Sequence, residues 1–132
     1  MTTLVLEAES LEAALGDPSA SGPFSRESVV AYDEAEAFPL EAWDAMLAHG
    51  YFDNFVPVDQ GGALHAFDRL LLLGRVLARR DLTTAIAAGQ CLLGALPVWL
   101  AGTPAQRARV AARLRAGEAL SLIHISEPTR PY

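Results

Sequence analysis

The sequence predicts an all-α protein, a small helical bundle, and three observations lead to this fold class. No charged residue occurs between Asp81 and Arg107, so residues 82–101 can form one long helix that is apolar nearly all round. Apolar residues recur at helical spacing in four further segments. Helix start and stop signals, Pro in the first turn or Gly after the last, delimit three of these segments.

Apolar residues at helical spacing predict a first helix over residues 4–15, which Gly16 ends. The next ten residues, 16–25, are rich in Gly, Pro and Ser and predict a loop. The pattern over residues 29–37 leaves two interpretations open, a frayed helix and an extended segment.

A second helix is expected to start at Phe38-Pro39, because Pro is favoured at the first helical position, and to end at Gly50. The aromatic-rich segment 50–57 is too short and irregular for a helix. Residues 58–62 then complete a turn. We interpret its Gly-Gly pair as part of that turn, because no strand and phosphate-loop pattern surrounds it.

Residues 64–80 predict a third helix, whose wide apolar face requires cover on more than one flank. The uncharged helix follows it, and Pro97 is the place where that helix is expected to kink. The last helix starts at a sharp capping signal, Thr103-Pro104 with Gln106, and ends at Gly117. Its four arginines predict a solvated basic surface rather than an anion site: Arg107, Arg109, Arg113 and Arg115.

Composition predicts one cytoplasmic, soluble domain. A length of 132 residues supports a single core, and the net charge of −6 argues against nucleic acid and anionic membranes as partners. The uncharged run contains polar residues and has arginines on both sides, so we expect a buried helix rather than a membrane span. The single cysteine, Cys91, fits a reducing compartment and a buried apolar role. No basic secretory start precedes the first helix.

The sequence offers no catalytic or metal-binding constellation. Its histidines lie far apart, with no Cys or carboxylate at ligand spacing: His49, His65 and His124. Three clustered carboxylates fit a solvated face better than an acid/base pair: Asp33, Glu34 and Glu36. We therefore expect no catalytic, cofactor-binding or metal-binding residue in this chain.

Six short motifs follow one another along the chain. They are Phe38-Pro39, His49-Gly50, Val56-Pro57, Gly61-Gly62, Gly102-Thr103 with Gln106, and Gly117-Glu118. Their order and spacing resemble the N-terminal helical domain of the acyl-CoA dehydrogenase family. The resemblance covers roughly residues 24–119.

The resemblance implies a parent oxidoreductase of three domains, in which a middle β-domain and a C-terminal helical bundle with the catalytic Glu follow this domain. Such a flavoprotein uses FAD to remove an α-proton and a β-hydride from an acyl thioester in fatty acid metabolism. It would pass electrons to an acceptor and form a homo-oligomer. This chain would wall the acyl and flavin pocket, and would be inactive and free of FAD when alone. By the same resemblance, Ala87, Gln90, Cys91 and Gly94 are candidates to line that pocket.

Two alternatives remain open. A flavin-dependent monooxygenase would share this fold, because the residue that decides the reaction lies outside the chain. A stand-alone helical interaction module would instead use an exposed apolar surface to bind a partner. Acyl chain length, electron acceptor and oligomeric state are not encoded in these residues.

We expect three segments: an N-terminal helix and flexible loop at 1–23, the family-like domain at 24–119, and a non-native tail at 120–132. Residues 120–130 resemble the in-frame translation of a transposon-type sequencing adapter. The chain before them is rich in Ala and has Arg but no Lys, which is typical of GC-rich coding DNA. Two of the three isoleucines, Ile123 and Ile125, fall in the tail. The tail is therefore expected to mark a truncated gene.

Overall fold

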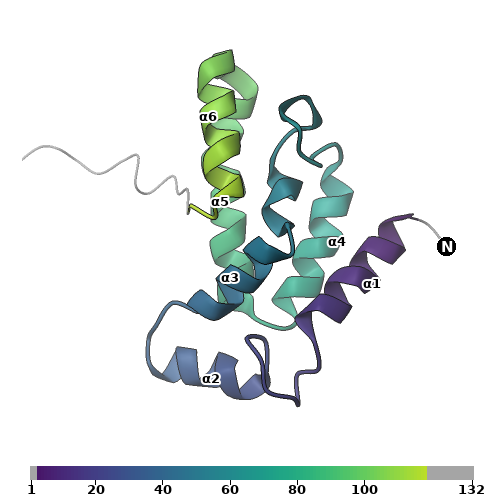
Figure 1. The fold of residues 1–132 in the computed structure, drawn as a ribbon, viewed down its shortest axis with the longest axis vertical. Helices are drawn as coiled ribbons and strands as arrows, with labels where there is room; N and C mark the ends of the chain where they lie inside the picture. The colour runs from purple at the N-terminus through teal and green to yellow at the C-terminus, as the bar shows by residue number, and fades with distance from the viewer. Residues whose placement is uncertain (1–2, 119–132) are drawn as a thin grey trace, which may run out of the picture.

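The computed structural model describes residues 3–118 and shows a bundle of helices (Figure 1). The α-helices are α1 (Thr3–Leu15), α2 (Arg26–Glu34), α3 (Leu40–Ala48), α4 (Phe67–Ala78), α5 (Leu82–Ala101) and α6 (Pro104–Arg115). Two 3₁₀ helices, η1 (Tyr51–Phe55) and η2 (Val58–Gln60), lie between α3 and α4. Over residues 3–118 there is no strand beyond an isolated bridge between Pro57 and Leu64. The predicted all-α fold is confirmed.

Helix α4 lies at the centre of the arrangement, with α1 packed on one flank and α5 on another. Helix α6 returns along α5, and the two form the tall pair in Figure 1. Helix α2 lies at the lower edge of the same view and has no buried residue. The prediction that the third helix is covered on more than one flank is thus confirmed.

An aromatic cluster in η1 fills the space between α3, α5 and α6. The rings of Trp43 and Phe52 lie 4.6 Å apart, and those of Tyr51 and Phe55 meet edge to face at 5.6 Å. Such pairs contribute about 0.5–1.5 kcal/mol each beyond their burial.

Two indole hydrogen bonds join this cluster to distant parts of the chain. Trp43 Nε1 donates to the carbonyl oxygen of Gly117 at 2.9 Å, and Trp99 Nε1 donates to that of Phe55 at 3.0 Å. The first bond joins α3 to the residues that follow α6, and the second joins the C-terminal part of α5 to the end of η1.

Several helix boundaries differ from the predicted ones. The open segment 29–37 belongs to α2 as far as Glu34, because Ser25 Oγ caps that helix by accepting from Ser28 N at 3.1 Å. Pro39 is the residue before α3 rather than its first. The expectation of no helix at 50–57 is wrong, since η1 spans Tyr51–Phe55.

The third helix starts at Phe67 rather than at residue 64. Backbone hydrogen bonds hold the preceding residues in a turn: Ala63 N donates to Asp53 O at 2.8 Å, and Leu64 N donates to Val56 O at 2.9 Å. These tertiary bonds outweigh the helical pattern of the side chains.

Helix α5 continues through Pro97 to Ala101, and the expectation that this apolar helix is buried holds for one side only. Only one side faces the core, with Thr84, Ala88, Cys91, Gly94 and Ala95 buried. The other side is open to solvent, because α4 and α6 do not reach it. By length and composition alone α5 is also able to cross a membrane, a test that core helices of soluble proteins pass as well.

The last helix and the Gly-Gly turn follow the sequence prediction. Thr103 Oγ1 accepts from Gln106 N, and the Gln106 side chain accepts from Thr103 N, which completes the capping box. Gly61 has φ +78°, and Gly62 packs directly on Val56.

Gly62→Ala is expected to lower the free energy of unfolding by about 2 kcal/mol or more. A Cβ at this position would lie 2.0 Å from the carbonyl oxygen of Val56, so the backbone must move. Gly22→Ala is the matched control, because nothing lies within 4 Å of its Cβ position. Its effect is expected to stay within about 0.5 kcal/mol. Urea unfolding of the two variants checks the difference, and equal effects would refute it.

Candidate functional site

An apolar groove of about 360 Å³ lies between α4 and α5 and is closed at one end by η1. Helix α4 lines it with Phe67, Leu70, Leu71 and Gly74, α5 with Ala85, Gly89 and Leu92, and η1 with Tyr51 and Phe55. Two of these residues, Gly74 and Gly89, have no atom within 4 Å of a built Cβ. The absence of side chains at these helix positions is what leaves the groove open.

Large apolar side chains surround the groove without being covered. On α4, Phe67 and Leu71 are exposed, Leu71 to 75%. On α5, Leu82, Ile86, Leu93 and Leu100 are exposed, and their spacing of four and seven residues places them on one stripe. An uncovered apolar surface of this extent marks a place where another molecule or another part of the protein binds.

The four candidate residues on α5 lie on a different side of the helix from this groove. Cys91 and Gly94 are buried in the core, whereas Ala87 and Gln90 are half-buried. The groove residues of α5 are Ala85, Gly89 and Leu92. Because each residue of an α-helix is rotated by about 100° from the one before it, the two sets project from roughly opposite sides of α5. The sequence analysis missed the groove, and the signal that could have indicated it is the pair of interior glycines in two apolar helices, Gly74 and Gly89.

Ion pairs connect α1 to α4 at two places. Near the end of α4, Glu12 binds Arg79 at 2.9 Å and Arg80 at 2.8 Å. The hydrogen bond from Arg80 holds the pKa of the Glu12 carboxyl below its usual value, against the opposing effect of burial. This contact therefore stabilises the docking of α1 above the ordinary pKa of Glu and weakens as the pH falls through the lowered value.

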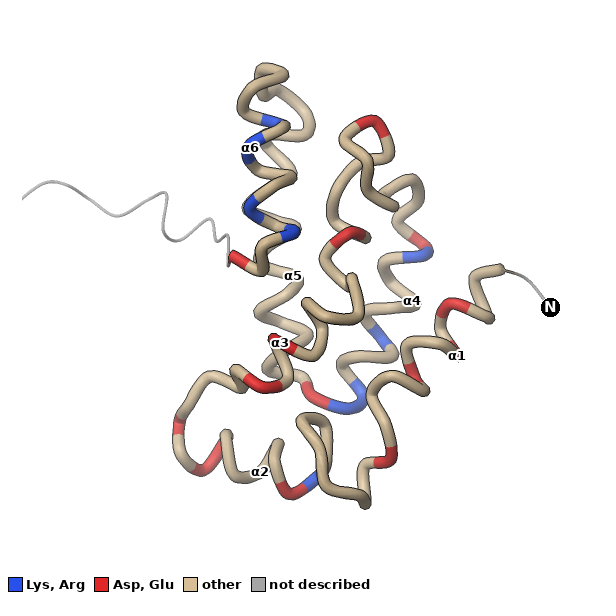
Figure 2. Tube along the Cα trace, viewed as in Figure 1, with Lys and Arg blue, Asp and Glu red and all other residues tan. Residues whose placement is uncertain are grey.

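The arginines of α6 are more engaged than a purely solvated face would be. Arg107 pairs with Asp59 at 3.1 Å, Arg113 with Glu118 at 2.5 Å, and Arg115 with Asp53 at 2.8 Å. Figure 2 shows this basic helix on the opposite side of the bundle from the acidic residues of α1. The expectation of a solvated basic surface is corrected to this extent, because η1, η2 and the end of α6 supply carboxylates.

Within residues 3–118, the candidate acid/base and metal-binding residues do not form a site. Asp33, Glu34 and Glu36 are all exposed, as predicted. Within residues 3–118, no three His, Cys, Asp or Glu side chains form a group that could hold a metal ion. His124 lies outside the described residues.

Two features of residues 3–118 were candidates for binding the phosphates of FAD, the N-terminus of α5 and the Gly-Gly turn, and neither fits them. The N-terminus of α5 is capped by the Asp81 carboxylate, which accepts from Thr83 N at 2.9 Å and would repel an anion. The Gly-Gly turn faces its own chain, since the Cβ position of Gly62 meets Val56. Neither feature therefore forms a cradle for a phosphate.

Residues 3–118 thus form a helical bundle with uncovered apolar side chains on α4 and α5. Comparison with known families identifies the family to which this bundle belongs. The family model "Acyl-CoA dehydrogenase, N-terminal domain" matches residues 24–118, and the chain therefore belongs to the acyl-CoA dehydrogenase family. No curated protein and no solved structure matches it significantly.

Stability is expected to fall above pH 10 because of Tyr51. Burial raises the pKa of its hydroxyl to about 12, so the folded state keeps the proton that the unfolded state releases near pH 10. The loss should reach about 1 kcal/mol by pH 11. Tyr51→Phe has no such proton and should show a flatter profile in urea unfolding from pH 8 to 11. Parallel profiles for the two proteins would contradict this assignment.

Proposed function

We propose that this domain forms one wall of the acyl-binding chamber of an FAD-dependent acyl-CoA dehydrogenase. The longer protein would dehydrogenate the α,β-bond of an acyl thioester and transfer the electrons to an acceptor. The observation that carries the proposal is the uncovered apolar groove between α4 and α5 in a chain of this family.

The groove suits a hydrocarbon chain or an apolar surface of the same protein. Its lining is mostly aliphatic and aromatic, with Arg75 at the edge as its charged member. Burial of an alkyl chain gains about 0.8 kcal/mol per methylene. Apolar pocket walls bind the hydrocarbon part of a ligand, and a few polar groups elsewhere in the pocket fix its orientation.

A second proposed surface is the side of α5 that carries Ala87, Gln90, Cys91 and Gly94. The family resemblance supports these residues as pocket-lining, and the groove geometry supports the opposite side. The two sides differ in exposure: Cys91 and Gly94 are buried, whereas Leu82 and Leu93 are open. We favour the open side as the apolar wall, because it needs no rearrangement of the core.

The catalytic base, the flavin site and the subunit contacts are proposed to lie in parts of the protein outside this chain. A homo-oligomer is the assembly that the family resemblance supports, and the acidic net charge and the single cysteine support a cytoplasmic location. A monooxygenase of the same fold and a stand-alone interaction module are the alternatives. Both would leave acyl-CoA dehydrogenation undetected.

Expression of the intact reading frame from the source DNA tests the proposal. The full-length protein is expected to purify with bound flavin and to reduce a dye acceptor when acyl-CoA is added. The 132-residue chain, purified in parallel, is expected to be colourless. Flavin bound to the short chain, or a genome that encodes residues 120–132 followed by a stop, would contradict the proposal. Oxygen-dependent hydroxylation would support the monooxygenase instead.

Gly89→Leu is expected to shorten the acyl chain that the full-length enzyme accepts, because its side chain fills the groove. The ratio of kcat/KM for long to short acyl-CoA should fall about tenfold, a change of about 1.4 kcal/mol. Ala112→Leu, on the exposed side of α6, is the matched control and should leave the ratio unchanged. Gly89→Ala should raise the stability of the 132-residue chain by up to about 1 kcal/mol. A ratio that stays constant in Gly89→Leu would remove the groove from the substrate path.

A further inference from the structure

Two arginines contact η1 and the turn at residues 56–66 that joins it to α4. On one side, Arg115 of α6 donates to Asp53 at 2.8 Å and to the carbonyl oxygen of Gln60 at 3.2 Å. On the other side, Arg69 of α4 donates to Asn54 in η1 and to the carbonyl oxygen of Ala63 in the turn. The two contacts differ in burial, since the Arg115 side chain is 38% exposed and the Arg69 side chain only 14%.

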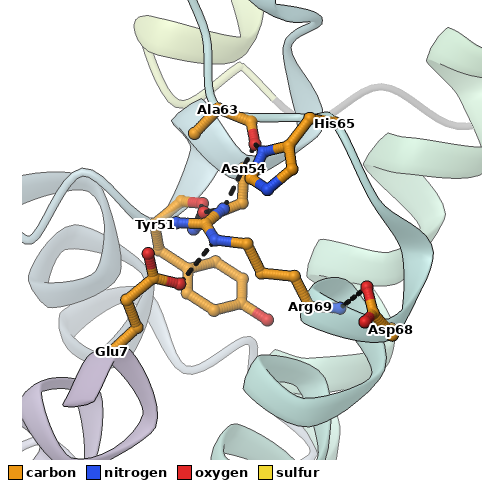
Figure 3. Close-up of polar contacts among 7 residues, drawn as sticks. All are labelled: Glu7, Tyr51, Asn54, Ala63, His65, Asp68 and Arg69. Carbon is orange, nitrogen blue, oxygen red and sulfur yellow. Dashed lines mark hydrogen bonds and ion pairs between the residues drawn. The ribbon is translucent and has the colours of Figure 1, made fainter. Parts of the chain in front are cut away.

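Arg69 makes four polar contacts, three of them through its guanidinium (Figure 3). Its Nη1 donates to the side-chain oxygen of Asn54 and, at 3.3 Å, to the carbonyl oxygen of Ala63. Its Nε donates to Glu7 Oε2 at 2.6 Å. The guanidinium therefore joins α1, η1 and the turn in one network.

Asn54 connects the Arg69 network to a residue that lines the groove. Its Nδ2 donates to the carbonyl oxygen of Tyr51 at 2.7 Å, and the whole side chain is buried. Tyr51 and Phe55, on either side of it in η1, form the end wall of the apolar groove. Through Asn54, Arg69 therefore contacts the element that forms this wall.

Glu7 is the countercharge that keeps Arg69 in place. A guanidinium that is mostly buried is costly without an opposite charge, because its desolvation is then uncompensated. Within residues 3–118, Glu7 is the carboxylate paired with Arg69. Glu7 belongs to α1, which precedes the residues that the family model matches.

We propose that α1 is a positioning element, which acts through Glu7 and Arg69 to fix η1 and the turn at residues 56–66. Loss of the Glu7 charge frees the guanidinium to turn toward solvent, so Asn54 and Ala63 lose their shared donor. The turn then opens while the rest of the bundle stays closed. The contacts of Glu7 and Arg69 require no assumption about the reaction proposed above.

Amide hydrogen exchange of the 132-residue chain, followed by NMR, tests the proposal. The amides of Ala63 and Leu64 are the reporters, because they donate to Asp53 O and Val56 O and close the turn. In Glu7→Gln, their exchange is expected to be about tenfold faster relative to the amide of Ala111 in α6.

Glu12→Gln is the matched control, since it removes a second carboxylate of α1, which within residues 3–118 forms its ion pairs with Arg79 and Arg80 rather than with Arg69. It should leave the ratio of turn to α6 exchange unchanged. An equal rise in both variants, an equal rise in α6, or no rise in Glu7→Gln would each overturn the proposal.

Arg69→Lys separates opening of the turn from undocking of α1. The lysine keeps the charge that attracts Glu7 but lacks the planar fork that reaches both Asn54 and Ala63. The turn amides should again exchange faster, whereas the amides of Leu11 and Leu15 in α1 should stay protected. Fast exchange throughout α1, or no change in the turn, would refute the role of the fork.

Discussion

The burial of η1 is the constraint on which the rest of this structure depends. Four of its five residues are buried, and its rings fill the space between α3, α5 and α6. A 3₁₀ helix packs its side chains closely at every third residue, so this short segment places Phe52 and Phe55 on one side. Both indole hydrogen bonds, the end of the groove and the two arginine contacts then take their positions from it.

One-sided burial of α4 and α5 follows from this arrangement. Because η1, α1 and α6 cover the inner sides of these helices, their outer sides meet only solvent in the chain described here. Leu100 is 86% exposed and Leu71 75% exposed, values that a helix completely covered by neighbours would not show. The sequence could not indicate this, because an uncharged apolar run shows that a helix can be buried but not which of its sides a neighbour covers.

The sequence predicted those features that depend on residues close together along the chain. The capping box at Thr103 and Gln106, the glycine after α6 and the family motifs are local signals, and each has a fixed chemical cause. The start of α4 could not be predicted in this way, because the hydrogen bonds of Ala63 and Leu64 reach back to η1. Periodicity shows that a helix has an apolar side, but not whether a neighbour covers it.

The candidate sites also combine features that local sequence indicates with features that only tertiary packing creates. The pair of Glu7 and Arg69 joins residues 62 positions apart, and no local pattern indicates such a contact. Gly74 and Gly89 were visible as glycines in apolar helices, yet their meeting in one groove depends on how α4 and α5 pack. The side of α5 that faces a ligand likewise depends on tertiary packing, so the pocket-lining role of Ala87 and Gln90 remains a proposal.

The weak engagement of α2 has a practical consequence for engineering. Helix α2 has no buried residue, and exposed turns rich in Gly, Pro and Ser precede it. In this loop residues 16–21 are exposed, whereas Phe24 and Ser25, next to the helix, are buried. Exposed loop residues tolerate inserted sequence best, so residues 19–21 are the place to graft an affinity tag or a fluorescent reporter while α1 stays packed on α4.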